Sequence, residues 1–246
     1  MYDGMLAKTI NIQGYDGDMI PAYLARPMDS GPHGGVVVIH HMPGWDEASK
    51  EITRTFARNG YLAICPHLHH RDAPGAGPDD AAAAARAAGG PPDARVIGDV
   101  AAAAGVVRAC TSSNGKVGAI GYCSGGRHAY LVAAELDLHA VVDCYGGGVV
   151  MEPDQLTEAR PVSPIDLTPQ IGCPLLGLFG AEDRNPSPEM VAQMEAALKA
   201  AGKDFEFHSY EGAGHAFFSV NRPNYRVEAA VDGWQKVLDF FGRHLS

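Results

Sequence analysis

Hydrophobic positions along the chain follow two periodicities in turn. Short aliphatic runs, such as 35–40 and 61–65, are apolar at nearly every position, which is typical of strands buried on both faces of a parallel sheet. Between them, segments such as 47–59 repeat apolar residues every three or four positions, as amphipathic helices do. We expect strands at 5–12, 19–26, 35–40, 61–65, 116–122, 140–145, 174–179 and 205–210, and helices at 47–59, 93–110, 125–135, 187–201 and 227–244.

This alternation predicts an α/β fold with a mostly parallel central sheet and helices on both faces, formed as a single domain over residues 1–246. The first two strands are joined by a hairpin turn at 14–17. Two segments break the pattern: 71–92, with a short helix expected at 81–88, and 146–170. Both follow strands, so we expect them near the carboxyl ends of the sheet, where ligands bind in such folds.

Composition narrows the class of protein. The net charge of −10 argues against nucleic acid or an anionic membrane surface as a partner. No apolar run reaches the length of a membrane span, and the first residues lack the pattern of a secretory leader. The five cysteines are odd in number and widely spaced, which is typical of reduced thiols rather than of a set of disulfides. We therefore expect a cytoplasmic protein, a monomer or small homo-oligomer, acting on a small molecule.

The most informative motif is Gly-Tyr-Cys-Ser-Gly at 121–125, where a strand runs into a helix. This arrangement is typical of a nucleophile elbow, in which flanking glycines let the chain reverse and lift the nucleophile above the sheet. Cys123 occupies the central position. The free N–H groups at the start of the helix favour a thiolate there, and the N–H of Ser124 is placed to serve as an oxyanion donor.

An acid and a histidine follow in the chain order that this elbow requires. Asp183 comes after the strand at 174–179, and His215 lies in a glycine-flanked loop before the last helix. His215 would take the proton of Cys123, and Asp183 would orient the imidazole. The rival acid, Glu182, fits a solvent-exposed position, and the rival histidine, His208, lies inside a predicted strand.

Three stretches, at 58–66, 114–123 and 210–217, resemble the dienelactone hydrolase family of α/β-hydrolases, and the resemblance covers nearly the whole chain. It implies the α/β-hydrolase fold and hydrolysis of a small ester or lactone through a thioester acyl-enzyme, with neither metal nor cofactor. The family's triad corresponds to Cys123, Asp183 and His215. Its oxyanion donors correspond to the backbone N–H groups of Met42 and Ser124.

The chain departs from the family pattern around the substrate. His41 stands where the family has a glutamate that pairs with the resting cysteine. The family's arginine at 81–88 corresponds to an alanine, although Arg86 is close by, and a second arginine is replaced by Ser219. The resemblance therefore implies the chemistry more firmly than the substrate. Candidates for lining the substrate pocket are His41, Trp45, His69, Arg86, Tyr145 and Phe217.

Histidines at 40, 41, 67, 69 and 70 leave two alternatives open. Imidazoles bind Zn, Ni and Cu, so these residues could form the site of a metal-dependent hydrolase. A polar pocket with one histidine acting on Cys123 is the interpretation we favour, because no acid or cysteine stands at clear ligand spacing; His41 is the histidine we expect to act. A ligand-binding protein without catalysis is the third hypothesis.

Overall fold

The computed structural model describes residues 4–220 and 222–246. The first residues, which we expect to lack the pattern of a secretory leader, lie outside it at 1–3. Contacts between elements group the chain into two units. The first extends to Ala119 and includes Leu245 and Ser246, and the second is Ile120–His244. Strand β5 (Ser113–Tyr122) belongs partly to each. A single domain remains a prediction.

The first unit begins with an antiparallel hairpin. Strands β1 (Met5–Gln13) and β2 (Met19–Pro27) pair with Ile12 opposite Ile20. The connecting turn contains a short 3-10 helix, η1 (Tyr15–Gly17), and Gly17 at its end has a φ of 82°. The predicted hairpin is therefore confirmed.

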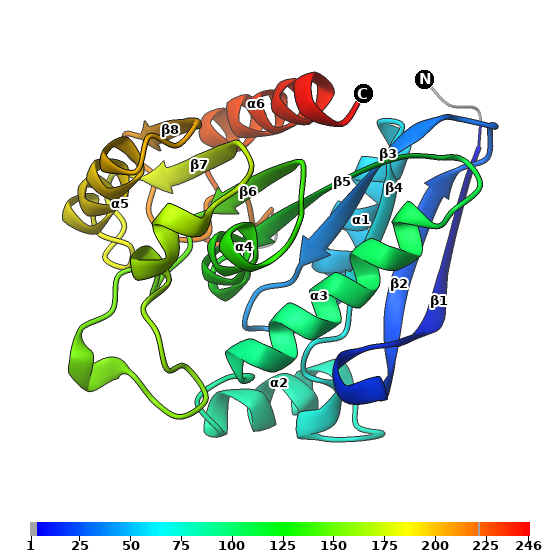
Figure 1. Ribbon diagram of the computed structural model, residues 1–246, viewed down its shortest axis with the longest axis horizontal. Helices are drawn as coiled ribbons and strands as arrows, with labels where there is room; N and C mark the ends of the chain where they lie inside the picture. Colours follow the sequence, from blue (N-terminus) through cyan, green and yellow to red (C-terminus); the bar gives the residue numbers. More distant parts are fainter. Residues whose placement is uncertain (1–3, 221) are drawn as a thin grey trace. The chain divides into compact units, whose positions relative to one another are not determined.

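Two buried parallel strands, β3 (His33–Ile39) and β4 (Leu62–Pro66), follow the hairpin in this unit. Every residue of both strands is buried. Helices α1 (Glu47–Arg58) and α3 (Asp93–Arg108) both pack on β4, with α3 in front of the sheet and α1 behind it in Figure 1. The apolar runs thus predicted strands covered on both faces. The strand order is β1-β2-β4-β3-β5.

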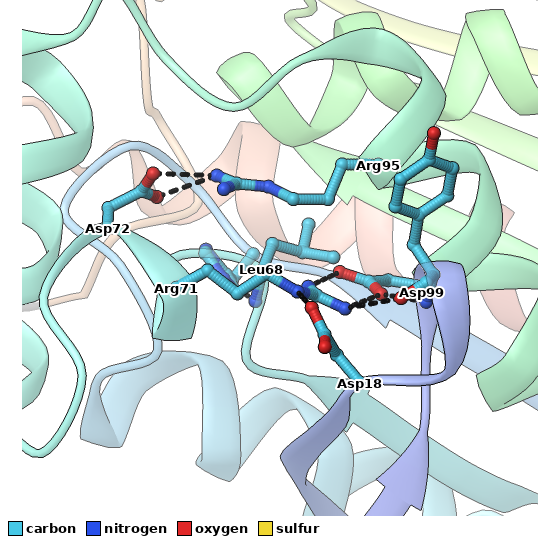
Figure 2. Close-up of polar contacts among 8 residues, drawn as sticks. Asp18, Leu68, Arg71, Asp72, Arg95 and Asp99 are labelled. Carbon is cyan, nitrogen blue, oxygen red and sulfur yellow. Dashed lines mark hydrogen bonds and ion pairs between the residues drawn. The ribbon is translucent and has the colours of Figure 1, made fainter.

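Arginine–carboxylate pairs fix the segment after β4. Figure 2 shows Arg71, in the 3-10 helix η2 (His70–Asp72), between Asp18 of the hairpin turn and Asp99 of α3. Its Nη1 and Nη2 donate to the two oxygens of Asp99 at 2.8 and 3.1 Å, and its Nε donates to Asp18 at 2.7 Å. Arg95 pairs with Asp72 at 2.8 Å. These pairs hold η2, against which helix α2 (Pro78–Ala87), the predicted short helix, packs.

The second unit is built on parallel strands. Besides the end of β5, its elements are the strands β6 (Ala140–Cys144), β7 (Leu175–Gly180) and β8 (Phe205–Tyr210) and the helices α4 (Ser124–Glu135), α5 (Pro188–Ala200) and α6 (Val227–Leu245). Strand β6 pairs with β7 and β7 with β8, in the order β5-β6-β7-β8, and helix α4 packs on β6. The predicted α/β fold with a mostly parallel sheet is confirmed.

The segment at 146–170, which has no hydrophobic periodicity, contains two 3-10 helices, η3 (Pro153–Gln155) and η4 (Pro164–Gln170). Each begins with a proline, whose fixed φ suits a helical first turn, and both are too short to show an apolar repeat. Thr168 of η4 is hydrogen-bonded to the hydroxyl of Tyr130 at 2.6 Å, which ties this segment to α4. No helix within the described ranges is long and apolar enough to cross a bilayer.

Candidate active site

The turn between β5 and α4 holds Cys123 in a strained backbone conformation. Cys123 is the N-cap of α4 with φ 57° and ψ −121°, a region that costs about 1–3 kcal/mol for a residue other than glycine. Gly121 makes the turn possible, since a Cβ there would lie 1.8 Å from the carbonyl oxygen of Gly125. The turn is held by hydrogen bonds from Cys123 N–H to Cys144 O and from Gly126 N–H to Cys123 O. Ser124 is the first residue of α4, as the motif predicted.

Asp183 and His215 lie on two loops that contact each other through their backbones. A Cβ on Gly180, at the end of β7, would lie 2.4 Å from Ala213 O, and Glu182 N–H donates to the same oxygen. The loops therefore approach closely because Gly180 has no side chain. Asp183 Oδ2 and His215 Nδ1 are 2.8 Å apart, and Asp183 Oδ1 accepts the N–H of Asn185. The carboxylate is thus held from both sides.

The protonation of His215 follows from its neighbours. Burial alone would lower its pKa, but hydrogen bonds to Asp183 and Cys123, with the charges of both groups, raise the pKa to about 10. The imidazolium form is therefore favoured, with the carboxylate on one ring nitrogen and the thiol group as the other hydrogen-bonding partner. Neither rival takes part in this pairing: Glu182 is exposed, and His208 lies within β8.

Two of the pocket candidates pack around this histidine. The Tyr145 ring meets the His215 ring edge to face, with centroids 5.2 Å apart. Tyr145 also has a positive φ of 44° and is 2% exposed. Phe217 is fully buried and contacts Tyr145 edge to face at 5.3 Å. Both rings therefore support His215 from the core, and their part in binding a substrate stays a prediction.

In the first unit, His41 forms a polar pair near the start of α1. Its Nε2 lies 2.8 Å from Asp46 Oδ2. Burial alone would raise the pKa of Asp46, but the hydrogen bond and charge of His41 and the N–H of Ser49 lower it to about 2. Asp46 is therefore a carboxylate, and the pair carries a salt bridge whenever His41 is protonated. A role for His41 at the thiol stays a prediction.

Three other histidines of this unit, His40, His67 and His69, lie in a buried aromatic cluster. The ring of His40 lies edge to face with His69 at 4.6 Å, and His67 stacks on Trp45 at 5.0 Å. Burial is the main cause that lowers the pKa of His67 and of His69 to about 4. Both nitrogens of His40 are engaged, with His41 O and Leu68 N–H. In the described part of the chain, no three His, Cys, Asp or Glu side chains are grouped as a metal site.

Arg86, on α2, reaches the loop that follows β3. Its Nη1 donates a long hydrogen bond of 3.4 Å to the carbonyl oxygen of Met42, the residue whose N–H is the other oxyanion donor implied by the family resemblance. The charge of Arg86 also contributes to lowering the pKa of His69. Arg86, Met42, His41 and His69 therefore belong to one region of the first unit.

Asp143, in β6, is a residue of the site that our sequence analysis missed. It is fully buried, and the positive charge of His215 acts on its carboxyl group. The available signal was an acid at the fourth position of an otherwise apolar strand, where a buried charge is rare.

Known proteins are similar to this chain over most of its length. The model of the dienelactone hydrolase family matches residues 20–245. A Yersinia pestis protein that carries a provisional assignment as a carboxymethylenebutenolidase is 36% identical over 231 residues, covering 93% of this chain and 85% of that protein. A Bradyrhizobium protein provisionally assigned as a 2-oxo-3-(5-oxofuran-2-ylidene)propanoate lactonase is 30% identical over 235 residues, covering 94% of this chain and 92% of its own.

A solved structure is similar over the whole chain. The crystal structure of a Klebsiella pneumoniae protein, provisionally assigned as a dienelactone hydrolase, superimposes with a TM-score of 0.89 at 32% identity. The match covers 98% of this chain and 100% of that one.

Proposed function

The chain belongs to the dienelactone hydrolase family, and from that premise we propose that it hydrolyses a small ester or lactone with Cys123 as the nucleophile. The observation that carries this proposal is the continuous hydrogen-bonded series from Cys123 through His215 to Asp183, built at a strained elbow. A structural cysteine would need neither the positive φ nor an imidazole beside its sulfur.

In the first half of the reaction, the Cys123 thiolate attacks the carbonyl carbon while His215 holds the proton. The negative charge that develops on the carbonyl oxygen is stabilised by the N–H of Ser124 at the start of α4, with Met42 as the second donor by family resemblance. When the tetrahedral intermediate collapses, the C–O bond breaks and His215 gives its proton to the leaving oxygen. The products are a thioester on Cys123 and a free alcohol, which for a lactone is the other end of the same molecule.

In the second half, neutral His215 removes a proton from water, whose oxygen attacks the thioester carbonyl. The C–S bond then breaks, which releases the carboxylic acid and restores the thiolate beside the imidazolium. Asp183 holds the imidazole through Nδ1 in both halves, so that Nε2 is the atom that exchanges the proton. None of these steps calls for a metal or cofactor.

The substrate is proposed only as a class. The Bradyrhizobium relative is named for a lactone, which supports including lactones beside simple esters. His41, Trp45, His69 and Arg86 remain our candidates for recognising it in the first unit, and Tyr145 and Phe217 in the second.

The nucleophile is tested by replacing Cys123 with alanine. We expect this variant to lose hydrolysis of nitrophenyl esters and of small lactones, and iodoacetamide to block the unmodified protein at this residue, as mass spectrometry of the labelled peptide would show. The matched control is Cys110→Ala, which removes another half-exposed thiol. Full activity in the Cys123→Ala variant would refute the proposal. Loss of activity in chelator would instead favour a metal-dependent hydrolase, and tight binding without turnover would favour a receptor.

A further inference from the structure

Asp143 is a buried acid that the proposed steps do not use. Its side chain is 0% exposed. Oδ1 accepts the N–H of Gly146 at 2.8 Å, and Oδ2 has no hydrogen-bond partner among the described residues. An ionised carboxylate with an unpaired oxygen is costly away from water, so these contacts favour the neutral acid.

The carboxyl group of Asp143 lies against the first turn of the elbow helix. A Cβ added to Gly126 or to Gly146 would stand 2.4 Å from Oδ1. Gly126 is the residue whose N–H closes the first turn on Cys123 O at 2.9 Å. The absence of two side chains therefore makes room for an acid directly beside the backbone that carries the nucleophile.

Few charged groups face Asp143. From the loop after β8, the positive charge of His215 acts on it, and from α4 and β6 it faces Tyr130 and Cys144. Burial raises the pKa of both of these groups far enough to keep them neutral. Arg127, also on α4, donates from Nε to Gly148 O. Burial raises the pKa of Asp143 to about 7, against the opposing effects of the Gly146 N–H and of His215.

We infer that Asp143 is a positioning residue for His215: its buried carboxyl holds the turn at 143–146, whose Tyr145 ring packs on His215, and its ionisation is coupled to the proton that His215 carries. This inference rests on the proposed function, which gives that proton its role. When Asp143 releases its own proton to solvent, the negative charge stabilises the imidazolium and opposes proton transfer to the leaving oxygen. The neutral acid is thus the form that supports turnover.

The test is the pH profile of the Asp143→Asn variant, which keeps the size of the side chain and an acceptor for Gly146 but cannot ionise. For an alkyl ester, whose leaving oxygen needs a proton, we expect wild-type kcat to fall about tenfold between about pH 6 and 8, as the neutral fraction of Asp143 falls from about 10/11 to about 1/11. The variant should lack this inflection. The control is Asp204→Asn, which changes an exposed acid in the same unit and should keep it. A purely structural role would lower kcat equally at every pH, so profiles with the same inflection would overturn the inference.

A second measurement covers the case in which the Asp143→Asn variant does not fold. In protein labelled with ¹³C at the aspartate carboxyls, we expect one carboxyl resonance to titrate near neutral pH. His215→Gln should move that titration to higher pH, because the imidazolium no longer stabilises the carboxylate. If every aspartate titrates below about pH 5, the inference is wrong. This readout needs no turnover, so an unreactive Cys123 refutes the proposed function alone.

Discussion

Gly121→Ala tests whether the geometry of the elbow, rather than the presence of a thiol, accounts for the proposed reactivity of Cys123. The substitution adds one methyl group two residues before Cys123. That Cβ would lie 1.8 Å from Gly125 O and 2.2 Å from Gly125 C. Both atoms belong to the backbone of the first turn of α4, so no side chain can rotate away to relieve the overlap.

The size of the effect follows from that overlap. Real Cβ atoms essentially never approach another heavy atom closer than 3.0 Å, so the strand and the helix turn must separate by 3.0 − 1.8 = 1.2 Å. A displacement of about 1 Å at a reacting group costs about 100-fold in rate, and overpacking of this kind costs about 1–3 kcal/mol of stability. We therefore expect kcat to fall about 100-fold while the protein still folds.

Two assays separate the local from the global effect. Ester hydrolysis and iodoacetamide labelling report on the thiol, and urea unfolding reports on stability. The matched control is Gly172→Ala in the same unit, where an added Cβ meets nothing within 4 Å and the change in stability should stay within about 0.5 kcal/mol. If Gly121→Ala hydrolyses esters and reacts with iodoacetamide at wild-type rates, the elbow does not set the reactivity of Cys123.

Two further predictions concern the first unit. The pKa values of His67 and His69 are lowered from 6.5 to about 4, so the folded state binds fewer protons than the unfolded chain and loses stability as the pH falls through that window. Urea titrations at about pH 5 and 8 measure how much the free energy of unfolding falls on acidification. In the His69→Phe variant this fall should be about 2 kcal/mol smaller than in the wild type, and an equal fall would contradict the lowered pKa of His69. Arg71→Met leaves the buried Asp99 carboxylate uncompensated and should lower the free energy of unfolding by about 3–5 kcal/mol. The control, Lys199→Met, removes the exposed ion pair with Glu195 and should lower the free energy of unfolding by less than about 1 kcal/mol. Equal losses in the Arg71→Met and Lys199→Met variants would refute the prediction that burial makes the Arg71–Asp99 pair the more important one.

The sequence was a good guide wherever one short segment carries the whole signal. Aliphatic runs such as β4 predicted buried strands, because a strand covered on both faces has no polar side to display. The elbow was recognisable for the same reason, since its two glycines and Cys123 lie within five residues. Chain order then predicted Asp183 and His215 as its partners, and in the structure Asp183 Oδ2 lies 2.8 Å from His215 Nδ1.

Contacts outside a recognised motif were not predictable in the same way. The partner of His41 is Asp46, five residues away, but nothing in the spacing says that the loop returns on itself. In the sequence, Asp143 is a single polar residue in an apolar strand. Only the fold places its carboxyl group beside α4, where the positive charge of His215 acts on it. The 3-10 helices at 153–155 and 164–170 lack a repeat because they are too short to have one.

Some glycines could be interpreted from the sequence motif, and others only from the contacts in the folded structure. Gly121, Gly126, Gly146 and Gly180 each stand where a Cβ would lie within 2.5 Å of another heavy atom, and all four belong to the segments around the proposed triad. Gly121 belongs to a recognised motif, and its contact is local. The close approaches of the other three involve segments far apart in the chain: Gly180 lets the loop of Asp183 meet the loop of His215, and Gly126 of α4 and Gly146 after β6 make room for Asp143. Each of these glycines lowers the stability of the segment that carries it, which is the cost of the close approaches around the proposed triad.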